Sequence, residues 1–244
     1  MRSLLIAKFI LLSHSHILFN SYVTRNFAPS KEIITSYDEF GELPQVENTK
    51  NAVRRSVSIV VLRSLNATFL GYSTANSSQF EVPLGSRPLN SLINPWQFIF
   101  LTGLVGDCRY VTRFARNRVL NYTVSYNHPP TGSYISSEIG NLLQEASSKG
   151  GGIRPLACHI FLIDAIDGKI YEIDCTGHVS SVIGGVGGVG ANEGYEHLER
   201  NVHDELTDEL AKNLTISTLA KMANISPDTL FSYNLIKIAD RGSS

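Results

Sequence analysis

The stretch "GELPQVENTKNAVRRSVSIVVL" (residues 41–62) joins two unlike segments. Its first half is polar and compatible with a helix, whereas from Val57 onward it is apolar and β-branched, which is typical of a buried strand. Pro44 fits a helix only near its start, because proline lacks the amide hydrogen that later turns need. We therefore predict a short helix or turn over residues 41–55 and a strand over 57–62. The helix has little apolar face with which to build a core.

The composition is that of an ordinary globular chain with one large core. The 244 residues are 43% hydrophobic and 18% charged, with a net charge of -1. This balance gives no sign of a basic stripe for nucleic acid or of an acidic tail. Three cysteines are too few for a disulfide framework, and their odd number leaves at least one unpaired, which favours a reducing compartment.

We interpret residues 1–36 as an N-terminal extension or leader that need not be ordered, and residues 37–244 as one domain. The first residues combine a basic start with an apolar run, as a signal peptide does, although Lys8 interrupts the run and no small-x-small cleavage site follows. Five Asn-x-Ser/Thr sequons permit glycosylation but arise by chance in a chain rich in these residues. No apolar run is long enough to span a membrane, so no membrane partner is expected.

Further along the chain, hydrophobic periodicity indicates strands, then two helices, strands, two helices and a last strand. The expected strands are 57–62, 68–72, 97–103, 156–164, 169–174, 178–184 and 230–239; the expected helices are 111–126, 135–146, 191–200 and 204–223. Residues 73–95 contain several prolines and are interpreted as loop-rich. Since two adjacent helices stand between sheet segments, the order favours an α+β sandwich of sheets covered by helix layers over a βαβ alternation.

The glycine-rich run "GVGGVG" (residues 185–190) fits the G-x-G-x-x-G pattern of dinucleotide-binding sites. It lies late in the chain, however, and no acidic residue ends a strand about 20 residues further on, where a ribose partner is needed. We therefore interpret the run as a tight strand-to-helix turn whose glycines permit positive φ. A dinucleotide-binding enzyme remains a weaker alternative.

Two other groups of residues resemble a metal site and a nucleophilic site, but neither has the spacing that its chemistry needs. Cys158, His159, Cys175 and His178 look like a four-ligand set, but neighbours on a strand point to opposite faces and cannot share one ion. No metal or other cofactor is therefore expected. There is no G-x-S-x-G motif. His128, His197 and His203 have no nucleophile to assist. His197 and His203 are six residues apart, so they share no helix face well, and we expect these two to be solvated.

Four segments together resemble the α-type subunits of the proteasome. "GELPQVENTKNAV" resembles the family's G-R-L-x-Q-V-E-Y-A-x-x-A-V element. Residues 102–127 resemble its S-G-L-x-x-D-A-R segment and following helix, residues 149–164 its Gly-Gly-x-Arg-Pro passage, and "YEIDCTG" (171–177) its Y-x-x-D-P-S-G turn. The order and spacing agree over about residues 37–240. The residues of the first element that match without a gap are Gly41, Leu43, Gln45, Val46, Glu47, Ala52 and Val53.

The resemblance implies an N-terminal-nucleophile fold, a four-layer αββα sandwich of two antiparallel sheets between helices. It also implies a role for the polar helix, which in that family lies across the top of the sandwich and packs in a ring instead of feeding the subunit's own core. The implied partners are neighbouring α-type subunits, inner β-type subunits and the C-termini of activators. The implied location is cytoplasm and nucleus. Ring-interface and gate candidates are Tyr37, Asp38, Gly41, Leu43, Gln45, Val46 and Glu47.

The active β-type relatives need a free N-terminal threonine, an acidic residue after the second strand and a lysine. Here Ser56 stands near the nucleophile position but follows Arg55 in the chain, so its amine is not free. Tyr72 (or Ser73, with a shift of one) replaces the acid, and no lysine occurs between residues 50 and 149. We therefore expect a noncatalytic structural subunit that contributes to ring assembly, pore gating and ubiquitin-dependent degradation. The alternative is a secreted or degenerate amidohydrolase of the same fold.

The family's activator pocket and gate are altered in this chain. The pocket lysine aligns with Leu89, and nearby Arg87 is the candidate replacement, although its planar fork makes a different contact. The gate's Tyr-Asp-Arg triplet aligns with residues 30–32 without a gap, or with residues 37–39 if about seven residues are missing. We prefer the gapless alignment, and in both alignments the arginine is absent. A weak activator pocket and altered gate contacts follow from the resemblance.

Overall fold

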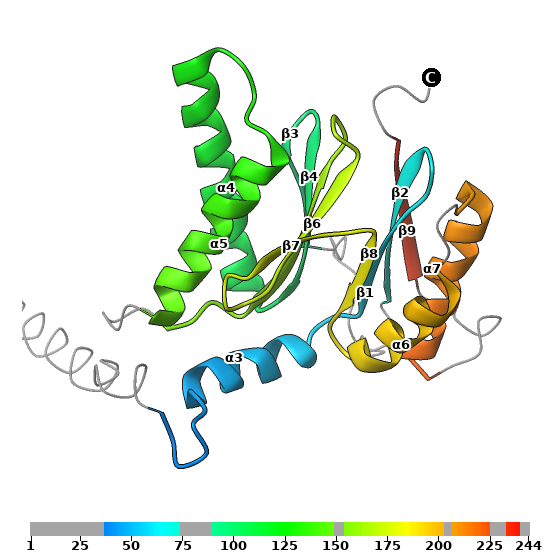
Figure 1. The fold of residues 1–244 in the computed structure, drawn as a ribbon, viewed down its shortest axis with the longest axis horizontal. Coiled ribbons are helices and arrows are strands. Elements are labelled where there is room, and N and C mark those ends of the chain that lie inside the picture. Colours follow the sequence, from blue (N-terminus) through cyan, green and yellow to red (C-terminus); the bar gives the residue numbers. More distant parts are fainter. Residues whose placement is uncertain (1–36, 74–88, 149–153, 203–205, 225–232, 240–244) are drawn as a thin grey trace, which may run out of the picture.

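The computed structural model describes residues 37–73, 89–148, 154–202, 206–224 and 233–239. The expected extension, residues 1–36, lies outside these ranges. The described chain forms two antiparallel sheets between layers of helices (Figure 1), which confirms the predicted α+β sandwich.

One sheet has four strands in the order β8-β1-β2-β9, and the other has five in the order β3-β4-β5-β6-β7. The first comprises β1 (Ile59–Arg63), β2 (Ala67–Ser73), β8 (Gly184–Gly187) and β9 (Tyr233–Ala239). The second comprises β3 (Leu89–Asn94), β4 (Gln97–Gly103), β5 (Cys158–Asp164), β6 (Lys169–Ile173) and β7 (Val179–Val182).

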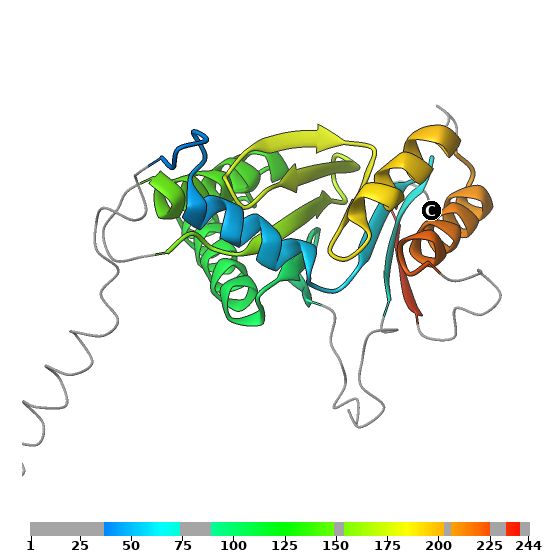
Figure 2. The same ribbon diagram turned by 90° about the horizontal axis from the view of Figure 1, so that it is seen from below.

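The helices cover the outer face of each sheet. α4 (Val105–Tyr126) and α5 (Gly132–Ser148) pack on the five-stranded sheet, whereas α6 (Ala191–Asn201) and α7 (Asp208–Met222) pack on the four-stranded sheet. α3 (Pro44–Arg54) belongs to neither layer and crosses one end of the sandwich, as Figure 2 shows from below.

Successive side chains of a strand point to opposite faces of its sheet, and this divides the core into three layers. In β1, Ile59 and Val61 face the other sheet, whereas Val60 and Leu62 face α6 and α7. All four side chains are almost completely buried. A strand buried on both faces reads as a continuous apolar run, which is why "SIVVL" stands out in the sequence.

The strand predictions need two corrections. The segment 73–95, interpreted as loop-rich, also contains a strand that was not predicted, because β3 pairs antiparallel with β4 between the prolines at 88 and 95. The segment 178–184 is not one strand: β7 pairs with β6 in one sheet, and the chain then crosses at Ile183 to form β8, which pairs with β1 in the other. At Ile183 the chain therefore connects the five-stranded sheet directly to the four-stranded one. The residues at 74–88 lie outside the described ranges.

Other boundaries differ slightly from expectation. α4 begins at Val105, ahead of the predicted stripe, and α7 begins after the N-cap Thr207, whose side chain accepts a hydrogen bond from the amide of Leu210. The last strand is described from Tyr233 onward. The hairpin turn at Asp167-Gly168 is confirmed, with Gly168 at φ +58° between β5 and β6.

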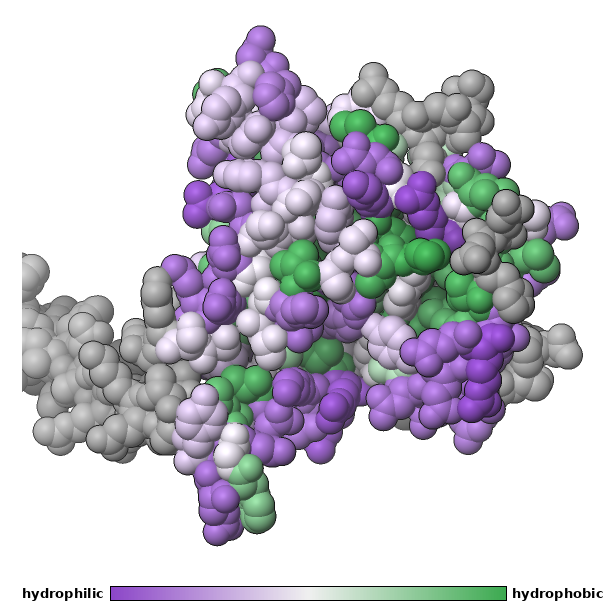
Figure 3. All heavy atoms as spheres, in the orientation of Figure 1, coloured by the Kyte–Doolittle hydropathy of each residue, from purple (hydrophilic) through white to green (hydrophobic). Residues whose placement is uncertain are grey.

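The surface is mixed (Figure 3): hydrophilic side chains cover α3 and α6 along the lower edge of the view, and hydrophobic ones reach the surface between the two sheets. No helix within the described ranges is both long and apolar enough to cross a membrane.

Candidate functional site

A tight turn precedes α3 and contains the first gate candidates. The carboxylate of Asp38 accepts hydrogen bonds of 2.9 Å from the amides of Phe40 and Glu42. Gly41 has φ +78°, a conformation that side-chain-bearing residues rarely adopt. Tyr37 is 70% exposed and Phe40 81% exposed. The turn therefore presents two aromatic side chains to the outside of the chain.

α3 begins at Pro44, which occupies the first turn, as predicted. Leu43, Gln45, Val46 and Glu47 are all half-buried in the single chain. Glu47 forms an ion pair of 2.6 Å with Lys50 one turn later, and this hydrogen bond raises the pKa of Lys50. The helix thus keeps its polar face outward.

The expectation that α3 need not contribute to the subunit's own core was wrong in one respect. Val53 is 8% exposed and packs with Ala157 and Cys175, and Ala52 joins the same small cluster. Thr49 is also buried and donates a hydrogen bond to the carbonyl of Gln45. The last two turns of α3 therefore attach it to the end of the sandwich.

Ser56 lies where α3 meets the sheets, and it is fixed on all sides. Its Oγ lies 2.5 Å from the carbonyl oxygen of Val53 and 2.7 Å from Oγ1 of Thr102. Its carbonyl oxygen accepts the amide of Val189, in the loop after β8. Its amide is the peptide amide to Arg55, the C-cap of α3, so no amine is available at this position to act as a base.

Tyr72 and Ser73, which the resemblance suggests in place of the acidic residue, both lie in the interior. Tyr72 is buried and packs edge-to-face on Phe100, with ring centroids 6.5 Å apart. Ser73 is also buried. Lys50 is paired with Glu47, as described above, and Lys237 is paired with Asp208 at 2.6 Å. Neither Lys50 nor Lys237 forms a hydrogen bond with Ser56.

A polar cluster between the sheets was not predicted from the sequence. His159 on β5 and Tyr195 on α6 both bind Oε1 of Glu172 on β6, at 2.8 Å and 2.5 Å. Burial acts to raise the pKa of Glu172, but the hydrogen bonds from His159 and Tyr195 outweigh it and the net pKa is lowered. Burial, the charge of Glu172 and this hydrogen bond raise the pKa of Tyr195. Glu172 is therefore ionised, and the neutral Tyr195 donates its hydroxyl hydrogen to the carboxylate.

This cluster does not form a nucleophile–base pair. Thr102 donates its hydroxyl hydrogen to the carbonyl of Val57 or shares it with Ser56. A Cβ added at Gly187 would lie 2.9 Å from the methyl carbon Cγ2 of Thr102 and 3.0 Å from Nδ1 of His159, so both side chains border this glycine. The arrangement can bind sheets together, but it lacks the hydroxyl-to-imidazole contact of nucleophilic catalysis.

The glycine-rich run serves packing and a turn. Gly188 and Gly190 have φ +86° and +72°, which confirms the predicted strand-to-helix turn. Gly185 and Gly187 instead lie in β8, where a Cβ would come within 2.6 Å of the Phe161 ring or 2.9 Å of Thr102. The strand positions are glycine because neighbouring side chains occupy the space of a Cβ.

The proposed opposite orientation of Cys158 and His159 is confirmed. Cys158 faces the α4–α5 layer, and His159 faces the other sheet. Burial raises the pKa of Cys108 to about 12 and that of Cys175 to about 11, which keeps the thiols protonated. Nowhere in the described ranges do three His, Cys, Asp or Glu side chains gather as a metal-ligand set.

The expectation of solvated histidines is wrong for His197 and lies outside the described residues for His203. His128 is exposed beside the tyrosines at the end of α4. His197 is half-buried, with Nδ1 3.1 Å from Oγ1 of Thr218, and burial followed by the charges of Lys221 and Arg200 lowers its pKa. His203 lies outside the described residues.

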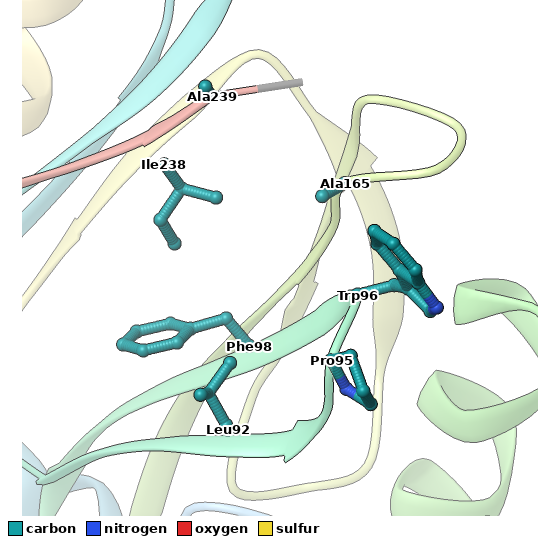
Figure 4. A pocket seen from close by; sticks show the side chains of 7 residues that line it. All are labelled: Leu92, Pro95, Trp96, Phe98, Ala165, Ile238 and Ala239. Atoms are coloured by element: carbon teal, nitrogen blue, oxygen red, sulfur yellow. The ribbon is translucent and has the colours of Figure 1, made fainter. Parts of the chain in front are cut away.

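The activator-pocket candidates fall largely outside the description. Arg87 lies outside it, and Leu89 is placed only as the first residue of β3. A cavity of about 210 Å³ does open at the far end of the sandwich, between β3 and β9 (Figure 4). It is lined by Leu92, Pro95, Trp96, Phe98, Ala165, Ile238 and Ala239. With no titratable side chain in its lining, it offers no acid or base.

Comparison with known proteins agrees with the fold. The family described as "Proteasome subunit" matches residues 91–238. The chain is 28% identical over 185 residues to "Proteasome subunit alpha type-7" of Solanum lycopersicum, covering 73% of this chain and 70% of that protein. It is 25% identical over 203 residues to "Proteasome subunit alpha" of Saccharolobus islandicus, covering 81% and 83%. The chain belongs to the proteasome subunit family, as a divergent member of its α type.

Proposed function

We propose that this chain is a noncatalytic structural subunit of the outer α ring of the proteasome core particle. The observation that carries the proposal is the state of Ser56. It is joined by a peptide bond to Arg55 and fixed by Val53, Thr102 and Val189. Joined to Arg55, Ser56 has no free amine, and none of its hydrogen-bond partners among the described residues is an acidic or basic side chain that could activate its hydroxyl.

The position of α3 supports the same proposal. Its buried residues attach it to one end of the sandwich, whereas Asn48, Asn51 and Arg54 are exposed. A helix held in this way can offer a rigid polar face to a neighbouring subunit. The exposed Tyr37 and Phe40 in the preceding turn add apolar surface for the same neighbour.

The test is to purify the complex that contains a tagged copy of the chain and to compare wild type with Ser56→Ala. We expect peptides of other α-type and β-type proteasome subunits in the complex, and equal rates of peptide hydrolysis for the two versions. A rate that falls with Ser56→Ala, or a chain that purifies alone and cleaves amides, would contradict the proposal. The second result would favour a separate amidohydrolase of this fold.

The proposal extends to the pore. The turn at residues 37–42 is held by the hydrogen bonds of Asp38 and by the positive φ of Gly41, so the backbone that leads into α3 has a defined path. Asp38→Ala should loosen this turn and raise peptide hydrolysis by the intact complex if the turn restrains the entry to the pore. An unchanged rate would argue against a role in gating. Activator C-termini are expected to bind weakly at this subunit.

The proposed process is ubiquitin-dependent protein degradation, in the cytoplasm and nucleus. Three buried free cysteines fit a reducing compartment. Fluorescence imaging of the full-length chain together with a β-type subunit tests the location. A signal confined to the secretory pathway, with glycan on the sequons, would contradict it.

A further inference from the structure

The sandwich is open along one side, where both sheets end in an edge strand. Within the described ranges, β9 pairs with β2 alone and β3 pairs with β4 alone. The apolar cavity of about 210 Å³ lies between these two edges, and side chains from both sheets line it (Figure 4). We call this opening, with the seven lining residues named above, the β3–β9 groove.

The core between the sheets is complete at its centre and incomplete at the groove. Ile59 and Val61 are almost completely buried, whereas Phe98 and Ile238, which belong to the same cluster, are only half-buried. Leu92 is the cross-strand partner of Phe98, so it lies on the same face of its sheet, and it is 58% exposed. Apolar surface that faces water here would be stabilised by a cover of apolar side chains.

The free edge of β9 is suited to accept another strand. β9 pairs with β2 without a bulge and contains no proline, and its one charged residue, Lys237, is bound to Asp208. Long, regular edge strands of this kind recruit further strands. The edge of β3 is partly covered instead, because Arg116 donates from Nε to the carbonyl of Leu92. A strand that enters the groove therefore pairs with β9 and brings its sheet to five strands, the number in the other sheet.

The sequence supplies an apolar segment of matching length. Residues 5–11, "LIAKFIL", lie outside the described ranges and are as many as the residues of β9. Every second residue of a strand points to the same face, and one such set is entirely apolar: Leu5, Ala7, Phe9 and Leu11. Lys8 falls in the other set. If the apolar set faces the groove, Lys8 shares the face of the sheet on which the exposed Lys237 stands.

The same chain is long enough to make this contact. Residues 12–36 form a linker of 25 residues, which spans up to roughly 80 Å when extended. A strand of the length of β9 covers only about 24 Å. β9 begins at the end of the sandwich where α3 lies, because Tyr233 pairs with Ser73, whose amide is bound to the carbonyl of Ser58. A segment antiparallel to β9 therefore brings residue 11 to the end at which residue 37 enters α3.

We propose that residues 5–11 dock in the β3–β9 groove as a fifth strand, antiparallel to β9, with Phe9 among the apolar side chains of the cavity. Main-chain hydrogen bonds to β9 supply affinity, and the alternate apolar side chains fix the register. The tether of 25 residues favours the segment of the same chain over that of a second copy. The proposal goes beyond ring assembly and does not rest on it.

Photo-crosslinking tests the contact in the full-length chain, purified with whatever it binds. A photo-crosslinking amino acid at Phe9 should join residues 5–11 to a peptide that contains β3 or β9 of the same chain. The matched control places it at Lys8, on the opposite face of the segment, and should give about tenfold less of that product. A mixture of copies with and without a heavy-isotope label distinguishes a contact within one chain from a contact between two.

Substitutions on both sides of the contact test its chemistry by hydrogen exchange of the β9 amides. Phe9→Asp places a carboxylate in the apolar groove and should speed this exchange about tenfold, whereas Lys8→Asp should leave it as in wild type. On the groove side, Leu92→Asp should act like Phe9→Asp. Its matched control is Leu210→Asp on α7, since Leu210 is 56% exposed and lies away from the groove. Circular dichroism checks that each variant folds.

The outcomes are separable from those of the ring proposal. A mature chain that lacks residues 5–11, a cross-link to another copy or another molecule, or equal exchange in all variants would overturn the docking proposal. If such a chain still joins a complex of proteasome subunits, only the docking proposal fails. If the cross-link to β3 or β9 forms in a chain that joins no such complex, only the ring proposal fails.

Discussion

Tyr195 donates a hydrogen bond of 2.5 Å to Oε1 of Glu172, and so joins α6, outside the four-stranded sheet, to β6 of the five-stranded sheet. The same carboxylate oxygen lies 2.8 Å from Nε2 of His159, which donates to it while Glu172 is ionised. Gly185 of β8 leaves space beside this contact, because a Cβ there would lie 3.5 Å from the tyrosine oxygen. The hydrogen bonds of Glu172 therefore connect α6 to the five-stranded sheet.

Removal of the tyrosine hydroxyl should weaken the sandwich. Tyr195→Phe leaves Glu172 with one partner fewer in a mostly buried site, and a hydrogen bond to a charged group contributes about 2 kcal/mol. We expect a lower free energy of unfolding in urea. Tyr110→Phe is the matched control, since Tyr110 is 47% exposed on α4, and it should unfold like wild type. Equal loss in both variants would show that the cross-layer bond contributes nothing specific.

The stabilisation by Glu172 should depend on pH. Its pKa in the folded chain is lowered from an ordinary 4.5, because the bonds from His159 and Tyr195 outweigh the effect of burial. A lowered pKa means that the contribution is present above pH 4.5 and is lost as pH falls through the folded pKa. The difference in unfolding free energy between wild type and Glu172→Gln should therefore shrink in acid. A difference that is constant from neutral pH to pH 4 and below would argue against the ionised cluster.

Two glycine-to-alanine substitutions should differ in their effect on the stability of the fold. In Gly185→Ala the new methyl group would lie 2.6 Å from the Phe161 ring, and such overpacking costs about 1–3 kcal/mol. In Gly106→Ala nothing lies within 4 Å of the new Cβ, and alanine in the first turn of α4 should be neutral or stabilising by up to about 1 kcal/mol. Thermal unfolding of both variants checks the contrast. A harmless Gly185→Ala would mean that β8 tolerates side chains.

The ion pair at the start of α4 should matter more than the one between α4 and α5. Asp107 binds both terminal nitrogens of Arg154, at 2.7 and 2.8 Å, and also accepts the amide of Ala157. Asp107→Asn removes the charge from a buried acceptor of three hydrogen bonds, although Arg154 itself is exposed, and should cost about 2 kcal/mol. Breaking the more exposed pair of Arg118 and Glu138 with Arg118→Gln should cost less than about 1 kcal/mol. Denaturant midpoints compare the two, and an equal loss would contradict this ranking.

Much of the fold was predictable because its signals are local. The apolar run of β1, the hairpin at Asp167-Gly168 and the apolar faces of the helices all follow from periodicity and turn chemistry. β3 was missed because it is a short edge strand flanked by prolines. The crossing at Ile183 was missed because the change of sheet leaves no mark in an alternating pattern.

The candidate site was predictable only in part. Pro44 and Gly41 signal the start of α3 through their backbone preferences, and both lie as expected. The contacts of Glu172 with His159 and Tyr195 depend on strand register and on a helix distant in sequence. The two glycines in β8 were a usable hint, since a strand without side chains implies close neighbours, but the neighbours themselves appear only in the folded chain.

The central claim is that this chain acts as a structural part of a larger ring and cleaves nothing itself. Native mass spectrometry of the tagged chain, purified under mild conditions, tests it most directly. The account predicts that the 26.8 kDa chain is recovered within a complex of many proteasome subunits. Recovery as a free monomer with a mature N-terminus at Ser56 and measurable amide hydrolysis would contradict it.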